Sequence, residues 1–251
     1  MRDLAPDDGD LFRPLYRAGA GAAFAMLALV PVQMVIFLVW PPPATATGIL
    51  ELYQRNTALG LLSLDLVYAV DMALTALLTL ALCAALRRAS PVLATLALTA
   101  SLVGTAVYFA STPVFSMLVV SSRHGAATSD AERSALQGAA EALVATYMGG
   151  ANGSAYALLT IGGLCLAFAM LRSHVFTRAT GVVALVVNLL MVVPSGAGKV
   201  GMVMSLASLP PLLVWWVLVA LRLLRLGRGA PPARAAVAEP PPMAPGLPAP
   251  S

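Results

Sequence analysis

The chain has 251 residues, of which 59% are apolar and only 10% are charged, and its mean hydropathy is +0.86. An average soluble domain is about 45–50% apolar and about 25% charged. The composition therefore excludes a disordered chain, an ordinary soluble enzyme and a nucleic-acid-binding protein. It predicts an integral membrane protein whose first partner is the lipid bilayer. The net charge of +4 says little about other partners until each base is located along the chain.

Six apolar stretches are long enough to be membrane-spanning helices. Such a helix needs about 20 apolar residues, because each residue rises about 1.5 Å through a hydrocarbon core about 30 Å thick. The sequence predicts an all-α, polytopic protein with six transmembrane helices in one bundle over residues 18–226. A short N-terminal segment, 1–17, precedes the bundle, and an Ala/Pro-rich, disordered tail, 227–251, follows it. The six stretches are residues 18–40, 57–86, 91–120, 148–171, 177–193 and 200–226.

The basic residues of the connecting segments predict the orientation. If the N-terminus is cytoplasmic, 11 of the 15 bases fall in cytoplasmic segments and 4 in outer segments. Cytoplasmic loops carry an excess of Lys and Arg, so both termini and the tail are predicted to be cytoplasmic. The 11 are Arg2, Arg13, Arg17, Arg87, Arg88, Arg172, Arg178, Arg222, Arg225, Arg228 and Arg234, and the 4 are Arg55, Arg123, Arg133 and Lys199.

Two outer segments are predicted among the first four spans, one between spans one and two and one between spans three and four. Residues 41–56 are interpreted as a loop that begins with three prolines, which stop the first span. The longer segment contains Ser129 and, three residues later, Glu132, the spacing of a helix capping box. Apolar residues then recur at helical spacing, which predicts a short amphipathic helix over residues 129–147 on the outer surface. This helix is interpreted as a cap over the bundle, with a lid or membrane-surface helix as the alternative.

Two carboxylates lie inside the second predicted span. Each of Asp65 and Asp71 costs about 2.5–3.5 kcal/mol near the centre of a spanning helix, so neighbouring helices, water or protonation of the acids must stabilise this span. Asp65, Tyr68 and Asp71 are spaced three residues apart and form a polar stripe across an arc of about 120°. Intramembrane acids face the bundle interior and mark functional sites, although hydrogen bonding between helices explains the stripe equally well.

The predicted topology brings other polar residues to the depth of Asp65, in the outer half of the bilayer. We hypothesise a polar pocket that opens outward, with Asp65 at its side and Asp71 at its floor. Ordinary structural contacts are the alternative. The candidate intramembrane site comprises Asp65, Tyr68, Asp71, Gln33, Tyr108, Asn152 and Asn188.

Enzyme and cofactor motifs fail on inspection. Residues 195–199 look slightly like a phosphate-binding loop, but Val193 stands where the first Gly is required and Val200 replaces the Ser or Thr. The sequence has neither a His-Glu-x-x-His zinc pattern nor a Gly-x-Ser-x-Gly elbow. His174 with Arg172 and Arg178 reads most simply as a cytoplasmic anchor cluster. No catalytic residue, metal site or cofactor is predicted.

Several short motifs resemble a bacterial family. They are residues 59–66 (Leu-Gly-Leu-Leu-Ser-Leu-Asp-Leu), 108–111 (Tyr-Phe-Ala-Ser), 129–133 (Ser-Asp-Ala-Glu-Arg) and 170–173 (Met-Leu-Arg-Ser). In this order they resemble the membrane proteins grouped as the "domain of unknown function 4386" family, over roughly residues 13–228. The resemblance implies six helices and a multi-pass protein of the bacterial inner (plasma) membrane. It implies no known activity.

Three functions compete at this point. The first is a non-catalytic membrane scaffold, sensor or partner subunit with an unknown protein partner. The second is a small-solute or proton-coupled transporter that uses the acidic stripe of the second span. The third, an intramembrane enzyme acting on lipid, lacks a recognisable nucleophile or metal set.

Overall fold

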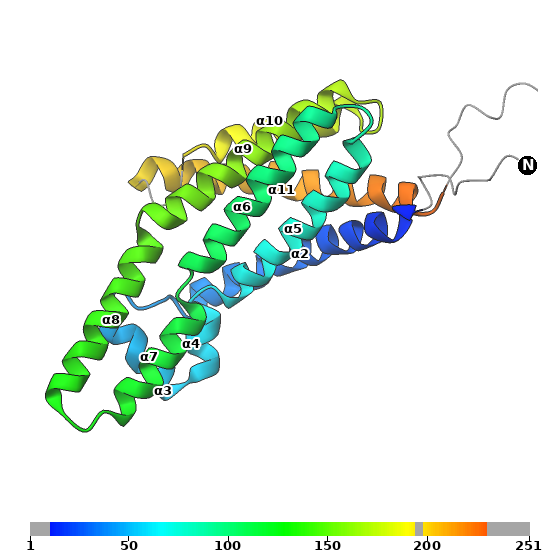
Figure 1. Cartoon of the computed structure of the whole chain (residues 1–251). Helices are drawn as coiled ribbons and strands as arrows, with labels where there is room; N and C mark the ends of the chain where they lie inside the picture. The colour runs from blue at the N-terminus through cyan, green and yellow to red at the C-terminus, as the bar shows by residue number, and fades with distance from the viewer. Residues whose placement is uncertain (1–10, 194–197, 230–251) are drawn as a thin grey trace, which may run out of the picture.

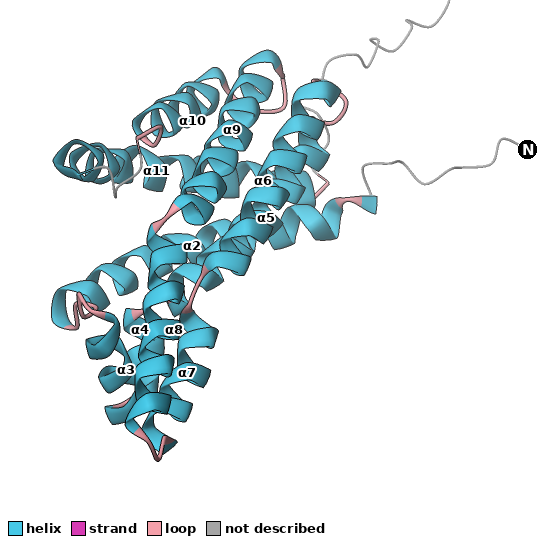
Figure 2. Cartoon of the chain, turned by 60° about the vertical axis from the view of Figure 1, so that its left-hand side comes forward, coloured by secondary structure: helices cyan, strands magenta, loops and turns pink. Residues whose placement is uncertain are grey.

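The structure is a computed structural model that describes residues 11–193 and 198–229. Within these ranges every regular element is an α-helix (Figures 1 and 2). The predictions for residues 1–10 and for the tail beyond residue 229 lie outside the described residues. The helices are α2 (Arg13–Val39), α3 (Ala46–Arg55), α4 (Thr57–Ser63), α5 (Leu66–Leu86), α6 (Pro91–Ser111), α7 (Val114–Ala126), α8 (Asp130–Met148), α9 (Gly150–Arg172), α10 (Arg178–Leu190) and α11 (Gly198–Gly227).

Five helical segments of the described chain are long and apolar enough to cross a membrane. They are Arg13–Val39, Leu66–Leu86, Pro91–Ala126, Asp130–Arg172 and Gly198–Gly227. The fifth predicted span corresponds to α10, whose 13 residues rise only about 20 Å. The structure therefore confirms that the described part of the chain is all-helical and that it has several apolar helices, five of them long enough to span a membrane.

Small residues bring α6 and α9 close together in the bundle. Ala97 and Ser101 of α6 are buried against Gly162 of α9. A Cβ atom at Gly162 would lie 3.1 Å from the Ala97 carbonyl oxygen and 3.2 Å from the Ser101 amide nitrogen. Membrane helices associate through such small-residue contacts, because lipid gives them no hydrophobic driving force. Other bundle contacts join α2 to α5 and α11, α5 to α6, and α10 to α9 and α11.

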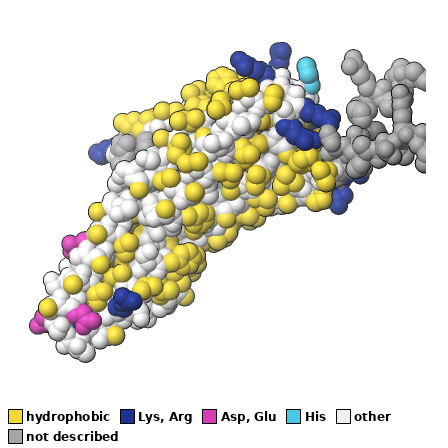
Figure 3. Space-filling view, in the orientation of Figure 1, with side chains coloured by type: hydrophobic (Ala, Val, Ile, Leu, Met, Phe, Trp, Pro, Cys, Tyr) yellow, Lys and Arg dark blue, Asp and Glu magenta, His cyan; other side chains and the backbone are white. Residues whose placement is uncertain are grey.

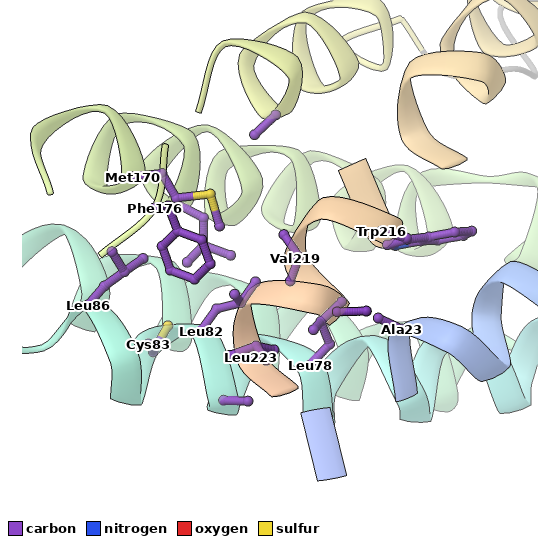
Figure 4. Close-up of a cluster of buried hydrophobic side chains, with 14 of the residues drawn as sticks. Ala23, Leu78, Leu82, Cys83, Leu86, Met170, Phe176, Trp216, Val219 and Leu223 are labelled. Carbon is purple, nitrogen blue, oxygen red and sulfur yellow. The ribbon is translucent and has the colours of Figure 1, made fainter. Parts of the chain in front are cut away.

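One apolar core joins α2, α5, α9 and α11 near the end of the bundle where α9 and α11 finish. Leu82 of α5, Met170 of α9 and Leu223 of α11 are fully buried in it (Figure 4). Phe176, from the loop between α9 and α10, inserts into the same core. At this end Arg17 Nε donates a hydrogen bond to the Gly227 carbonyl at 3.0 Å, so the start of α2 and the end of α11 are adjacent.

Helices α3, α4, α7 and α8 form a separate packed unit, here called the lobe, at the other end of the bundle (Figures 1 and 2). Its own apolar core includes Leu50 and Tyr53 of α3, Met117 of α7 and Ala140 of α8. Together α6 and α7 make a 36-residue helical segment. At about 1.5 Å per residue this segment exceeds the thickness of a bilayer by about 24 Å, which leaves room for the lobe outside it.

The structure corrects three local predictions. Residues 57–86 are not one helix, because α4 ends at Ser63 and α5 starts at Leu66. Residues 91–120 are likewise divided, since Pro113 cannot donate a backbone hydrogen bond within a helix and α7 begins directly after it. The segment 41–56 is not a simple loop. It contains α3, whose first turn is capped by the Thr45 side chain.

The helix predicted over residues 129–147 is confirmed as α8. Ser129 is its N-cap, and its side chain accepts a hydrogen bond from the Glu132 amide at 3.3 Å. In return, Glu132 Oε2 accepts a hydrogen bond from the Thr128 amide at 3.3 Å. Such reciprocal bonds satisfy backbone donors that a helix start otherwise leaves unpaired, which is why the spacing Ser-x-x-Glu located this helix correctly.

Candidate functional site

Asp65 lies at the break between α4 and α5, where the lobe meets the bundle. Its backbone is left-handed, with φ of 72°, a conformation in which Asp is several-fold enriched over most other residues. The Asp65 carbonyl accepts the first hydrogen bond of α5, from the Ala69 amide at 2.9 Å. Its carboxylate Oδ2 accepts a hydrogen bond from the hydroxyl of Tyr147, in the last turn of α8. A side chain of the lobe therefore holds the residue that starts α5.

Three further tyrosines surround this carboxylate. The phenols of Tyr53, Tyr68 and Tyr108 all lie within electrostatic range of Asp65. The rings of Tyr68 and Tyr108 meet edge to face, with their centroids 5.2 Å apart. Aromatic pairs prefer this arrangement, so α5 and α6 are locked together one turn below Asp65.

Tyr53 fastens the lobe to the same junction. Its hydroxyl donates a hydrogen bond to the Val114 carbonyl, the first of α7, at 3.0 Å. Its ring packs on Gly60 of α4, where a Cβ atom would lie 2.7 Å from the ring. Burial raises the pKa of Tyr53, and the nearby Asp65 charge raises it further. Tyr53 lies outside the five segments of spanning length. Because its pKa is raised, the phenol stays protonated and keeps donating its hydrogen bond.

Asp71 continues the polar face of α5 into the bundle. It follows Tyr68 by three residues, and residues at this spacing share a face of a helix. Its carboxylate oxygen Oδ1 is buried and makes no hydrogen bond to another described residue. The hydroxyl of Thr105 on α6 is buried in the same way. Unpaired buried oxygens are costly, so water or protonation of Asp71 must satisfy them in the membrane.

Gln33 lies on α2 at about the same depth. Gly19 of α2 packs on Ala81 of α5, and the two helices are antiparallel. Gln33 lies fourteen residues after Gly19, and Val67 lies fourteen residues before Ala81, so the two are expected at a similar level of the bundle. The two neighbours of Val67 on the polar face, Tyr68 and Asp71, are within one turn. The amide nitrogen and oxygen of Gln33 are buried without a hydrogen-bond partner among the described residues.

The two asparagines of the predicted site have different surroundings. Asn152 lies half-buried in the first turn of α9. The side-chain amide of Asn188 donates a hydrogen bond to Ala184 in its own helix at 2.8 Å. That helix, α10, packs against α9 and α11. The structure thus brings Asp65, Tyr68, Asp71 and Tyr108 together, and it separates Asn188 from them.

The arrangement provides hydrogen bonding and proton exchange rather than metal coordination. Among the described residues, no group of three His, Cys, Asp or Glu side chains is close enough to hold a metal ion. Two carboxylates surrounded by phenols can take up or release a proton, and each change alters which group donates the hydrogen bond. At Asp65, protonation would weaken the bond from Tyr147, since hydrogen bonds to charged acceptors are the stronger kind.

Sequence reasoning missed Tyr147 and Tyr53 as members of this site. Tyr147 is the last residue of the stretch predicted as an amphipathic outer helix, 129–147, and Tyr53 lies in the segment interpreted as a loop, 41–56. A signal was present in each residue, because the hydroxyl of a buried Tyr usually finds a partner. The partner itself depends on how α8 and α3 pack on the bundle, which helical periodicity does not encode.

Comparison with known proteins adds no relative: no family model, curated protein or solved structure matches the chain.

Proposed function

We propose that this chain is a bacterial inner-membrane protein with six membrane-spanning helices and both termini in the cytoplasm. It acts without catalysis, as a sensor or partner subunit in which the lobe faces outward and is coupled to the bundle. In this proposal α10 is the sixth span and crosses a locally thinned bilayer, which a short apolar helix tolerates at modest cost. The resemblance to the "domain of unknown function 4386" proteins agrees with this assignment and remains a prediction.

The distribution of charge supports the proposed orientation. Lys and Arg side chains gather at the end of the bundle where α9 finishes, whereas Asp and Glu side chains are visible on the lobe (Figure 3). The bases at the bundle end come from the starts of α2 and α10, the ends of α9 and α11, and the turn after α5. An excess of Arg at one end is the signature of the cytoplasmic side, which leaves the lobe on the outer side.

The observation that carries the functional proposal is the hydrogen bond from Tyr147 to Asp65. It joins the end of α8, in the lobe, to Asp65, the N-cap residue of α5 in the bundle. Anything that binds or displaces the lobe therefore acts on α5 through this contact. Conversely, a change in the protonation of Asp65 acts on the lobe. A two-way contact of this kind is what a sensor or partner subunit requires.

Asp65→Asn and Tyr147→Phe should each loosen the junction by about 1–2 kcal/mol, because the first replaces the charged acceptor of the bond with a neutral amide and the second removes its donor. The measurement is hydrogen–deuterium exchange of α8 and of the first turns of α5 in lipid nanodiscs. The double variant should exchange little faster than Tyr147→Phe alone, since both changes act on the same bond. Fully additive effects would contradict the coupling.

Two controls separate this proposal from its rivals. Thr146→Val changes the neighbouring residue of α8, whose hydroxyl bonds only within its own helix, and should leave exchange in α5 unchanged. A proton-coupled transporter instead predicts proton flux in proteoliposomes that Asp65→Asn abolishes. Flux of that kind would overturn the proposed non-catalytic role in favour of a carrier, whereas no flux above protein-free vesicles agrees with the proposal.

A further inference from the structure

A basic cavity of about 590 Å³ lies between α9, α10 and α11 at the Arg-rich end of the bundle. Four Arg side chains line it: Arg172 at the end of α9, Arg178 at the start of α10, and Arg222 and Arg225 in the last turns of α11. These bases come from three consecutive helices: Arg172 and Arg178 flank the loop between α9 and α10, and the fold brings the end of α11 to the same space. The polar site at Asp65 lies towards the opposite end of the bundle.

The charge of this cavity is not balanced by nearby acids among the described residues. Every carboxylate of the described chain lies elsewhere, on α3, α5 and α8 or at Asp65. The one ion pair found there joins Arg55 to Glu51, both on α3. Four guanidinium groups around one space repel each other, and an anion between them removes that repulsion. Arginine is also the residue whose planar fork best fits phosphate oxygens.

The wall of the cavity is held in place before any ligand arrives. Arg222 Nε donates a hydrogen bond to the Val175 carbonyl at 2.5 Å, which fixes the loop between α9 and α10. Phe176 of that loop is buried in the apolar core, and the Thr177 side chain caps α10 by accepting a hydrogen bond from the Thr180 amide at 3.2 Å. The binding surface is therefore pre-organised, which reduces the entropy lost on binding.

The remaining lining distinguishes a lipid from a free anion. Leu171, Leu218 and Leu221 line the same cavity as the four arginines, and Leu221 has 46% of its surface exposed. On a spanning helix, an exposed Leu beside the last basic turn faces the boundary between headgroups and acyl chains. Inorganic phosphate gains nothing from contact with these apolar side chains. A phospholipid, in contrast, places its phosphate among the bases and its glycerol and acyl ends against the leucines.

We propose that this cavity binds the phosphate-bearing headgroup of an anionic phospholipid. The site is on the leaflet that the proposed orientation makes cytoplasmic, but binding itself does not depend on the sensor role. Basic pockets between transmembrane helices on that side are suited to anionic headgroups. The bound lipid bridges α9, α10 and α11, and so fastens the short helix α10 to the rest of the bundle.

The test uses the full chain, purified and delipidated in detergent, with phosphatidylglycerol as the probe and native mass spectrometry as the readout. Arg178→Gln combined with Arg225→Gln should bind phosphatidylglycerol about 30-fold more weakly than the unchanged protein, since each base near an anionic group contributes a factor of about five. The matched control, Arg123→Gln with Arg228→Gln, removes the same charge outside the cavity and should bind normally. Circular dichroism on both variants confirms that they are folded.

Three outcomes would overturn the proposal. The first is equal phosphatidylglycerol binding by the cavity variant and the unchanged protein. The second is an equal loss in the control variant, which would indicate general attraction to the protein's bases instead of binding in the cavity. The third is full displacement of phosphatidylglycerol by an equal concentration of inorganic phosphate, which would assign the cavity to a free anion instead of a lipid. Retained phosphatidylcholine binding in all variants agrees with the proposal, because that headgroup carries no net charge.

Discussion

Tyr53→Ala should unfold the lobe while leaving the bundle intact. Removal of a fully buried aromatic side chain costs about 3–5 kcal/mol, and Tyr53 is 2% exposed. The change also removes the hydrogen bond that the Tyr53 hydroxyl donates to the Val114 carbonyl at 3.0 Å, at the start of α7. The core of the lobe is small, so a loss of this size approaches the whole stability of a compact unit, about 5–15 kcal/mol.

Limited proteolysis in nanodiscs measures this effect. Cleavage of Tyr53→Ala is expected within α3, α7 and α8, and the rest of the chain should stay protected. Tyr53→Phe is the graded control, since it keeps the ring and removes only the hydroxyl. Its loss should be about 1 kcal/mol, the net value of one hydrogen bond. If Tyr53→Ala resisted protease as well as the unchanged protein, the lobe would not depend on this side chain.

Gly162→Val should separate α6 from α9 and destabilise the bundle as a whole. A Cβ atom at Gly162 would lie 2.2 Å from the Ser101 hydroxyl and 3.1 Å from the Ala97 carbonyl oxygen. The hydroxyl can rotate, but backbone atoms cannot move without shifting α6. Overpacking of this kind costs about 1–3 kcal/mol, and the Val side chain extends beyond Cβ, so a value near 3 kcal/mol is expected.

The measurement is thermal unfolding in detergent, with Gly153→Val as the matched control. Gly153 lies on the same helix, and a Cβ atom placed there meets nothing within 4 Å. Both substitutions carry the same intrinsic helix preference, so the difference between them isolates the contact with α6. Equal melting temperatures for the two variants would mean that the two helices do not approach each other as closely as Gly162 requires.

Apolar length and capping chemistry explain why much of the helical fold was predictable. Residues 18–40 and 200–226 appear as α2 and α11 with boundaries shifted by a few residues, because their pattern depends only on local composition. The capping box at Ser129 and Glu132 located α8 for the same local reason. By contrast, the break at Asp65 interrupts an apolar run with no Gly or Pro within three residues of it. At this break Asp65 accepts a hydrogen bond from Tyr147, eighty-two residues away, and local composition does not encode such a contact.

The candidate site was predictable only in part. Asp65, Tyr68 and Asp71 are recognisable because charged and polar residues are rare within spans. Tyr108 is predicted to lie at the depth of Asp65 because α5 and α6 are consecutive and antiparallel. Asn188 was included by depth alone, and depth does not tell which helices touch. The lobe was the largest omission. Its core requires α3, and the three prolines before Ala46 made that segment look like a loop.

In the proposed topology, the lobe and the Arg-rich end lie on opposite sides of one bilayer. Single cysteines test this directly, after Cys83 and Cys165 are replaced by Ala. Gly138→Cys places a thiol in open space on α8, and Ala179→Cys places one on the exposed first turn of α10. In intact bacterial spheroplasts, a membrane-impermeant maleimide should label Gly138→Cys at once and Ala179→Cys only after lysis. Labelling of both thiols before lysis, or of Ala179→Cys alone, would contradict it.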